Sequence, residues 1–219
     1  RPYKEKDFDE VLEVTMQLWN LKMKPFTRKN IKVNSNIIRD TGSIPKKINE
    51  GIIIAEVDGH VAGVVHLDFK GKKESKKVSL SNIKLIIKYG LIRLLKVQSM
   101  GRFFEHRIDD DELHIHGIVV SDKYRGLGIG TSIFKYIEAF AKNKELKKIT
   151  LEVLNTNEKA YSLYKRLGFL EFKISKFNLK QKRYFKADTH IYMVREVKWY
   201  VRYIIKNVMI AIKNQINLK

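Results

Sequence analysis

The chain has 219 residues, of which 44% are hydrophobic, and it contains no cysteine. This length and composition can bury one sizeable core and argue against intrinsic disorder. The lack of cysteine excludes disulfides, thiolate nucleophiles and cysteine-ligated metals. The formal net charge of +20 predicts a positive surface field, whose partner could be a nucleic acid, an anionic membrane, an acidic protein or a polyphosphate cofactor.

The N-terminal half is predicted to contain two helices, a hairpin and a helical insertion. The helices and the two strands of the hairpin are expected over residues 7–21, 27–40, 51–57 and 61–67. Asp58 and Gly59 separate the two strands and form a typical hairpin turn signal. Residues 83–104 are apolar on most of their circumference, which predicts one or two helices that are packed or membrane-facing.

The C-terminal half is predicted to alternate strands and helices and to end in a helix. The expected elements are a strand over 113–120, a helix over 130–143, a strand over 148–154, a helix over 157–167, an antiparallel pair over 169–179 and 184–197, and a helix over 199–218. Gly168 is expected to terminate the helix before it. This order predicts a mixed α/β three-layer sandwich rather than a regular parallel winding.

The most informative stretch runs from Val119 to Thr131, where a strand enters a turn with glycines at alternate positions and a helix begins at once. Glycine permits positive φ and lets backbone N–H groups approach an anion. A helix N-terminus adds unpaired donors and partial positive charge, and Arg125 can add a contact to a phosphate. The stretch therefore predicts a pyrophosphate site, with a flexible surface turn as the alternative.

A second constellation follows the next strand. Asn157, Ala160 and Tyr164 recur at helical spacing, so they share one face of a helix. Without further context, Tyr164 could also be a core aromatic with a satisfied hydroxyl group.

Together the two stretches resemble the Gcn5-related N-acetyltransferase family. Arg125, Gly128 and Gly130 match its pyrophosphate motif, Arg/Gln-x-x-Gly-x-Gly/Ala, and residues 157–169 match its Asn-x-x-Ala-x-x-x-Tyr-x-x-x-Gly-Phe signature. The motif-bearing resemblance covers about residues 113–172. The insertion and the last helix depart from the minimal family pattern.

The resemblance implies the acyl-CoA N-acyltransferase fold, in which a mostly antiparallel sheet is splayed at a central parallel pair and has helices on both faces. It implies acetyl-CoA as co-substrate, a primary amine as acceptor, direct attack within a ternary complex, and no metal. The cofactor-binding residues that it assigns are Ile118, Val119, Val120, Arg125, Gly126, Leu127, Gly128, Ile129, Gly130, Thr131, Asn157, Ala160 and Tyr164.

The resemblance also assigns catalytic roles. Tyr164 falls at the family's position for the general acid beside the CoA sulfur. His116 stands where many members have a glutamate, and it is the first candidate for a base or water relay, or else it points into the acceptor pocket without proton transfer. Gly117 is expected at a bulge, after which the N–H of Ile118 or Val119 would face the acetyl carbonyl. Lesser candidates for the base are Asp68, Glu112 and His114.

The sequence leaves the acceptor open. The segments expected to form the acceptor site, 21–36 and 181–188, are basic and favour an acidic acceptor, whereas the acidic run 109–112 favours a polyamine. A small molecule or a protein amine also fits.

The acetyltransferase domain is predicted over residues 1–197, with the insertion at about 78–106. Residues 198–219 are predicted to form a basic amphipathic helix that packs on the domain or on a partner subunit of a homodimer. The start of the chain is polar and shows no secretory signal, so we expect a cytoplasmic protein. The alternative is a basic protein that binds nucleic acid or a membrane surface and has a regulatory or degenerate acyl-CoA site.

Overall fold

The computed structural model describes residues 1–23, 31–72, 83–103 and 106–198, and in them six strands form one sheet in the order β1-β2-β3-β4-β6-β5. The strands are β1 Ile52–Val57, β2 His60–Asp68, β3 Glu112–Val120, β4 Lys148–Leu154, β5 Leu170–Lys176 and β6 Thr189–Glu196. β3 and β4 are parallel, and the other neighbouring pairs are antiparallel. The predicted mixed sheet with a central parallel pair is confirmed.

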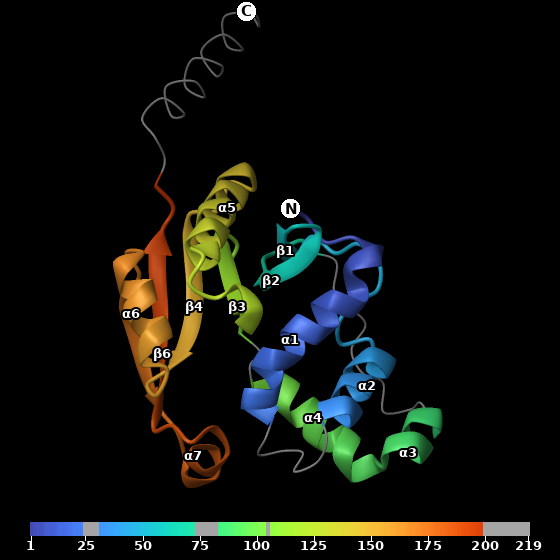
Figure 1. The fold of residues 1–219 in the computed structure, drawn as a ribbon. Coiled ribbons are helices and arrows are strands. Elements are labelled where there is room, and N and C mark those ends of the chain that lie inside the picture. Colours follow the sequence, from blue (N-terminus) through green and yellow to red (C-terminus); the bar gives the residue numbers. More distant parts are fainter. Residues whose placement is uncertain (24–30, 73–82, 104–105, 199–219) are drawn as a thin grey trace, which may run out of the picture.

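Helices lie on both faces of the sheet (Figure 1). One buried cluster joins the sheet to α5 Ile129–Asn143 and involves side chains of α6 Glu158–Arg166. A second cluster joins β1 and β2 to α1 Phe8–Met23, α2 Ile31–Thr41 and α4 Leu91–Phe103. The three predicted layers are therefore present.

The hairpin and the central strand form where their sequence patterns predict them. Asp58 and Gly59 have φ angles of 50° and 81°, the left-handed pair that a two-residue hairpin turn requires. In β4 the side chains of Ile149, Leu151 and Val153 enter the α5-side core. Because side chains alternate along a strand, Thr150 and Glu152 face the opposite side of the sheet.

The insertion packs on the domain. It forms α3 Ile83–Tyr89 and α4, which are separated at Gly90, where φ is 80°. Tyr89, Leu94 and Val97 are buried in the second cluster, and the Tyr89 hydroxyl donates to Asp40 at 2.6 Å. Among the helices of the described segments, none is long and apolar enough to cross a membrane.

One predicted region is wrong. The strands expected over 169–179 and 184–197 are shorter, because α7 Leu179–Phe185 lies between β5 and β6. Asn178 accepts a hydrogen bond from the Gln181 N–H, and the Gln181 side chain accepts one from the Asn178 N–H, both at 2.9 Å. This reciprocal capping starts a helix in the segment that the sequence predicts to be the loop between the two strands and their adjoining ends. The helix predicted over 199–218 lies outside the described residues.

Candidate active site

The parallel strands β3 and β4 separate about halfway along their length. They pair from Glu112 and Lys148 as far as Ile115 and Leu151, and beyond these residues the two strands no longer pair with each other. At the same point β3 bulges against β2: Gly117 pairs with His66 and Ile115 with Leu67, so that His116 is an extra residue. The predicted bulge at Gly117 is confirmed, and it opens a gap in the middle of the sheet.

A pocket occupies this gap, and the predicted residues meet in it. Its lining includes His114, His116 and Ile118 from β3, and Asn157, Ala160 and Tyr164 from α6 and its N-terminus. The fold therefore brings the signature helix next to the bulged strand.

The backbone of β3 presents alternate groups to the gap. Ser121 donates its N–H to the Ala62 carbonyl of β2 at 2.9 Å. Because successive residues of a strand direct their backbone groups to opposite sides, Val119 also points towards β2. By the same alternation, Ile118 and Val120 direct their N–H and C=O groups away from β2, towards the gap.

The predicted phosphate cradle lies at the end of β3 and the start of α5. Gly126 and Gly128 have φ angles of 83° and 73°, and an added Cβ at either residue would meet no atom within 4 Å. Gly128 is the N-cap of α5, so the first N–H groups of the helix, from Ile129 onwards, have no acceptor within the helix. The loop is thus open to an approaching ligand and leads directly to the backbone N–H donors at the start of α5.

Arg125 is exposed and pairs with Asp122, with 2.5 Å between Nη2 and Oδ1. A phosphate contact from Arg125, as the motif predicts, would have to replace or share this ion pair.

Tyr164 stands on α6 with its ring among aromatic side chains. Its ring centroid lies 5.8 Å from that of Phe134 and 5.9 Å from that of Phe169. Burial raises the pKa of Tyr164 to about 12. The hydroxyl group is therefore protonated at neutral pH and can donate a proton or a hydrogen bond into the pocket.

His116 is paired with a carboxylate. Its Nε2 lies 3.1 Å from Oδ2 of Asp68, and Lys72 lies 3.2 Å from the other oxygen. Burial raises the pKa of Asp68, but the hydrogen bond from His116 and the charge of Lys72 lower it more, to about 2. Asp68 is therefore ionised at neutral pH and accepts the Nε2–H of His116.

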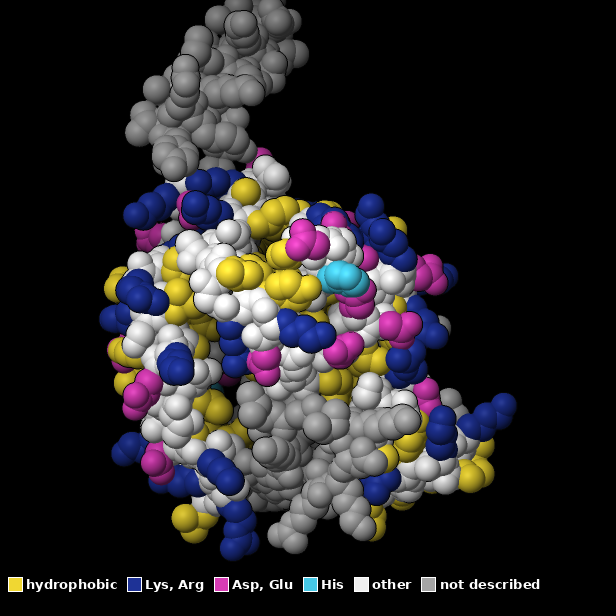
Figure 2. Space-filling model, in the orientation of Figure 1, with side chains coloured by type: hydrophobic (Ala, Val, Ile, Leu, Met, Phe, Trp, Pro, Cys, Tyr) yellow, Lys and Arg dark blue, Asp and Glu magenta, His cyan; other side chains and the backbone are white. Residues whose placement is uncertain are grey.

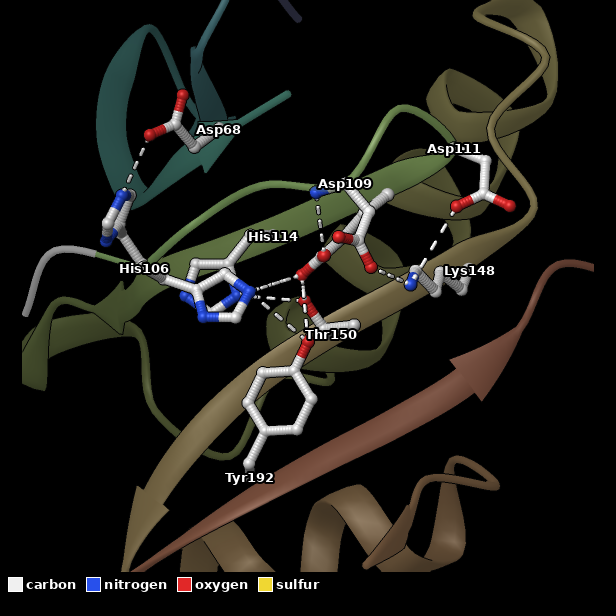
Figure 3. Close-up of polar contacts among 10 residues, drawn as sticks. Asp68, His106, Asp109, Asp111, His114, Lys148, Thr150 and Tyr192 are labelled. Atoms are coloured by element: carbon white, nitrogen blue, oxygen red, sulfur yellow. Dashed lines mark hydrogen bonds and ion pairs between the residues drawn. The ribbon is translucent and has the colours of Figure 1, made fainter. Parts of the chain in front are cut away.

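A buried polar cluster lies beside these residues (Figure 3). Its centre is the Glu112 carboxylate, which accepts hydrogen bonds from Thr150 Oγ1, from His106 Nε2 at 2.9 Å and from the Tyr192 hydroxyl at 2.9 Å. His114 Nδ1 lies 2.8 Å from Thr150 Oγ1. Burial raises the pKa of Glu112. The nearby His114 ring, whose Nδ1 lies 3.7 Å from Oε1, and the hydrogen bonds donated by Thr150, the Asp109 N–H and Tyr192 lower this pKa well below its usual range.

His106, Glu112 and His114 also form the group of described residues that could hold a metal ion, since their ligand atoms lie within 4.8 Å of one another. In this structure the same atoms are joined by hydrogen bonds to one another and to Thr150. The absence of a metal from the reaction stays a prediction.

Sequence reasoning missed part of this site. Thr150, Tyr192 and His106 were not singled out, nor was the pair of Glu152 and His190, whose Oε2 and Nδ1 are 3.3 Å apart at the pocket. The alternation of apolar and polar residues over 148–154 could have indicated Thr150 and Glu152, since both occupy the non-core face. His106 and Tyr192 carry no comparable signal, because each joins the cluster from a different segment.

Comparison with known proteins agrees with this geometry. Residues 15–169 match the sequence model of the acetyltransferase (GNAT) family. The chain belongs to this family. It is 37% identical over 84 residues to the mouse thialysine N-epsilon-acetyltransferase, which covers 38% of this chain and 44% of that protein. It is 28% identical over 130 residues to an N-alpha-acetyltransferase of Sulfurisphaera tokodaii, covering 59% of this chain and 62% of that protein.

Solved structures show the same fold. An N-acetyltransferase from Staphylococcus aureus Mu50 superposes with a TM-score of 0.57 at 20% identity, covering 89% of this chain and 98% of that chain. Ard1 from Thermoplasma volcanium superposes with a TM-score of 0.54 at 14% identity, covering 91% and 97%. The matched stretches span less than two thirds of the length of the two curated relatives.

Basic and acidic side chains are mixed on the face of the molecule that Figure 2 draws. Figure 2 shows lysine and arginine side chains over much of this face, interspersed with acidic ones rather than gathered into one patch. Among the described residues several lysines are paired with carboxylates, as Lys88 is with Asp40 at 2.7 Å and Lys144 with Glu50 at 2.7 Å. This face gives the nucleic-acid alternative no particular support.

Proposed function

We propose that this protein is an N-acetyltransferase that moves an acetyl group from acetyl-CoA to a primary amine by direct attack within a ternary complex. The observation that carries the proposal is the pocket between the parted strands β3 and β4, which Tyr164 and the bulged residue His116 both line. Family membership and the neighbouring phosphate cradle support the same activity.

The donor is proposed to bind along β3 and the cradle. The loop from Arg125 to Thr131 would hold the pyrophosphate through backbone N–H groups at the start of α5. Ile118 and Val120 would pair with the pantetheine arm, because their backbone groups point into the gap. Of the two donors open for the acetyl carbonyl, Ile118 is favoured over Val119 for the same reason. Val119 would contribute packing instead.

Asn157 and Ala160 are proposed to flank the arm from α6. The Asn157 side chain accepts a hydrogen bond from the Ala160 N–H at 3.3 Å and so caps the helix that carries Tyr164. The cap fixes the first turn of α6 against the pocket, and its loss would displace Tyr164 as well.

Tyr164 is proposed as the general acid and His116 as the base or water relay. The departing thiolate needs a proton or a hydrogen bond, which the neutral Tyr164 hydroxyl can supply. The amine must shed a proton before it attacks, since an ammonium group has no lone pair. Asp68 orients His116 for this task by accepting its Nε2–H.

The acceptor is proposed to be a primary amine that approaches on the side of α1 and α7. The names of the relatives suggest two amines to test, a lysine-like side-chain amine and a peptide α-amine. Polyamines remain in the proposal because Glu152, a pocket residue, can attract a cation.

The test is a calorimetric titration of acetyl-CoA into the purified protein, followed by an amine screen with lysine, thialysine, spermidine and peptides with free N-termini. We expect micromolar binding of acetyl-CoA and turnover with at least one amine. If the protein binds no acetyl-CoA, the enzyme proposal is wrong, and nucleic-acid or membrane binding at high net charge becomes the leading function.

A further inference from the structure

His114 is a further imidazole in the lining of the pocket, beside His116 and His190. His114 lies on β3 two residues before His116, and their ring centroids are 5.0 Å apart. Unlike His116, His114 is almost completely buried, with 3% of its surface exposed. The hydrogen bonds of this buried ring determine which of its two nitrogens carries the proton and which can accept one.

The direction of each hydrogen bond in the cluster follows from Glu112. An ionised carboxylate can only accept, so Thr150 uses its one hydroxyl proton to donate to Glu112. The Thr150 oxygen is then an acceptor for its other neighbour, Nδ1 of His114, at 2.8 Å. His114 must therefore carry its proton on Nδ1.

This tautomer leaves Nε2 of His114 with a lone pair. The described residues offer Nε2 no hydrogen-bond partner, and the pocket is the open space beside the ring. Burial lowers the pKa of His114, the neighbouring His116 and His106 lower it further, and Glu112 raises it. The ring is neutral at neutral pH, which is the state a proton acceptor requires.

The cluster also fixes the position of the ring. His106 stacks on one face of His114 with 4.4 Å between centroids, and Tyr192 lies parallel at 6.4 Å. Tyr192 and His106 both bond to Glu112, so the groups that hold His114 are themselves held (Figure 3). Such outer support keeps a reacting group within the narrow geometry that proton transfer needs.

Acetyl transfer to an ammonium group releases two protons from nitrogen. The first leaves before attack, which frees the lone pair, and the second leaves the tetrahedral adduct as the amide forms and the C–S bond breaks. Tyr164 gives its hydroxyl proton to the thiolate and regains one of these two protons, and the other goes to solvent. The adjacent imidazoles of His114 and His116, 5.0 Å apart between centroids, both line the pocket where these two protons would leave.

We propose that His114, held in its Nδ1–H tautomer by Thr150 and Glu112, accepts a proton from the substrate amine. It would act together with His116, so that the amine has two proton acceptors. Thr150 and Glu112 are positioning residues that act through His114. The proposal rests on the proposed acetyl transfer. It assigns roles in that reaction to Thr150 of β4 and to Glu112 and His114 at the start of β3.

The first test reads the tautomer without any turnover. Long-range ¹H–¹⁵N spectra of the histidine rings, assigned with His114→Gln, distinguish Nδ1–H from Nε2–H. We expect Nδ1–H for His114 in the wild type and in Thr150→Ser, and a mixture or Nε2–H in Thr150→Val. A wild-type ring protonated on Nε2 would overturn the proposal and leave the proposed function intact.

The second test measures kcat against pH with the best amine of the screen. Thr150→Val is expected to lower kcat roughly 10- to 100-fold and Thr150→Ser to restore most of it. The ascending limb should move to lower pH in Thr150→Val, because the imidazolium loses an acceptor. The titratable groups around His114, namely His106, Glu112, His116 and Tyr192, stay in place in both variants.

Thr15→Val is the matched control, because buried Thr15 makes a similar bond to His66, with 3.1 Å between Oγ1 and Nε2. We expect its kcat and pH profile to match the wild type, and acetyl-CoA affinity to be unchanged in every variant. Wild-type kcat and pH profile in both Thr150→Val and His114→Gln would overturn the proposal. Absence of turnover with every amine would instead overturn the proposed function, and the proposal with it.

Discussion

The phosphate cradle and the polar cluster around Glu112 are built in opposite ways. The cradle is a contiguous loop of backbone groups, exposed to solvent, whose shape depends on the left-handed φ angles of Gly126 and Gly128. The cluster is made of buried side chains from β3, β4, β6 and the segment before β3. A site formed by backbone groups of one loop can be predicted from adjacent residues of the sequence. A network of side chains from several strands depends on the pairing register of the sheet.

The cradle should fail at one glycine without loss of the fold. Gly128→Glu is expected to weaken acetyl-CoA binding at least about 100-fold, because the new carboxylate repels the pyrophosphate and fills the space it needs. Gly42→Glu is the control: Gly42 has a φ of 67° and equally open surroundings. Both variants should lose about 1–2 kcal/mol of stability through the strained φ. Equal loss of affinity in the calorimeter would contradict a phosphate site at Gly128.

Substitution of Tyr164 tests whether the pocket supplies the proton for the departing thiolate. Tyr164→Phe is expected to lower kcat about 100-fold, since the thiolate loses its proton donor, with little change in acetyl-CoA affinity. Tyr161→Phe on the same helix removes a hydroxyl that bonds to Glu171 instead, and should leave kcat unchanged. Steady-state kinetics at saturating acetyl-CoA would measure both, and a wild-type kcat in Tyr164→Phe would contradict the acid role.

The cluster should be more important for stability than the cradle. Glu112→Gln is expected to cost about 2 kcal/mol, roughly 30-fold in the folding equilibrium, because a buried acceptor of several donors becomes partly a donor. Asp110→Asn, at an exposed residue, should cost much less. Denaturant unfolding at pH 7 would measure the difference, and equal midpoints for the two variants would refute it.

The wild type and Glu112→Gln also differ in how their stability depends on pH. The pKa of Glu112 is lower in the folded protein than its ordinary value of 4.5, so the ionised carboxylate stabilises the fold above that value. The stabilisation is lost as pH falls through the folded value. The gap in unfolding free energy between wild type and Glu112→Gln should therefore be full at pH 7 and shrink below about pH 4.5.

The smallest effect is expected at the carboxylate that orients His116. Asp68→Asn should lower kcat roughly tenfold, because the amide holds the imidazole less firmly than an ionised acceptor does. With its pKa near 2, Asp68 stays ionised across the working range, so the wild-type pH profile should show no limb from it. A wild-type kcat in Asp68→Asn would indicate that His116 needs no orientation.

Much of the fold could be predicted because its signals are local. The Asp58-Gly59 turn, the alternation in β4 and the Gly168 helix end each depend on a few adjacent residues. α7 was missed because the short segment between the two predicted strands was interpreted as a loop, although Asn178 and Gln181 form a capping pair at its start. Of the site, the sequence indicated Tyr164, His116 and the cradle through motifs of fixed spacing.

The resemblance to the family, the glycine cradle and the signature helix could be predicted from the residues alone, because each depends on the order of neighbouring residues along the chain. The separation of β3 and β4 after Ile115 and Leu151, and the position of Thr150 between Glu112 and His114, follow from the fold. These relations join residues more than thirty positions apart. Their physical origin is the pairing register of the sheet, which sets the side-chain neighbours across strands and is not written in either strand alone.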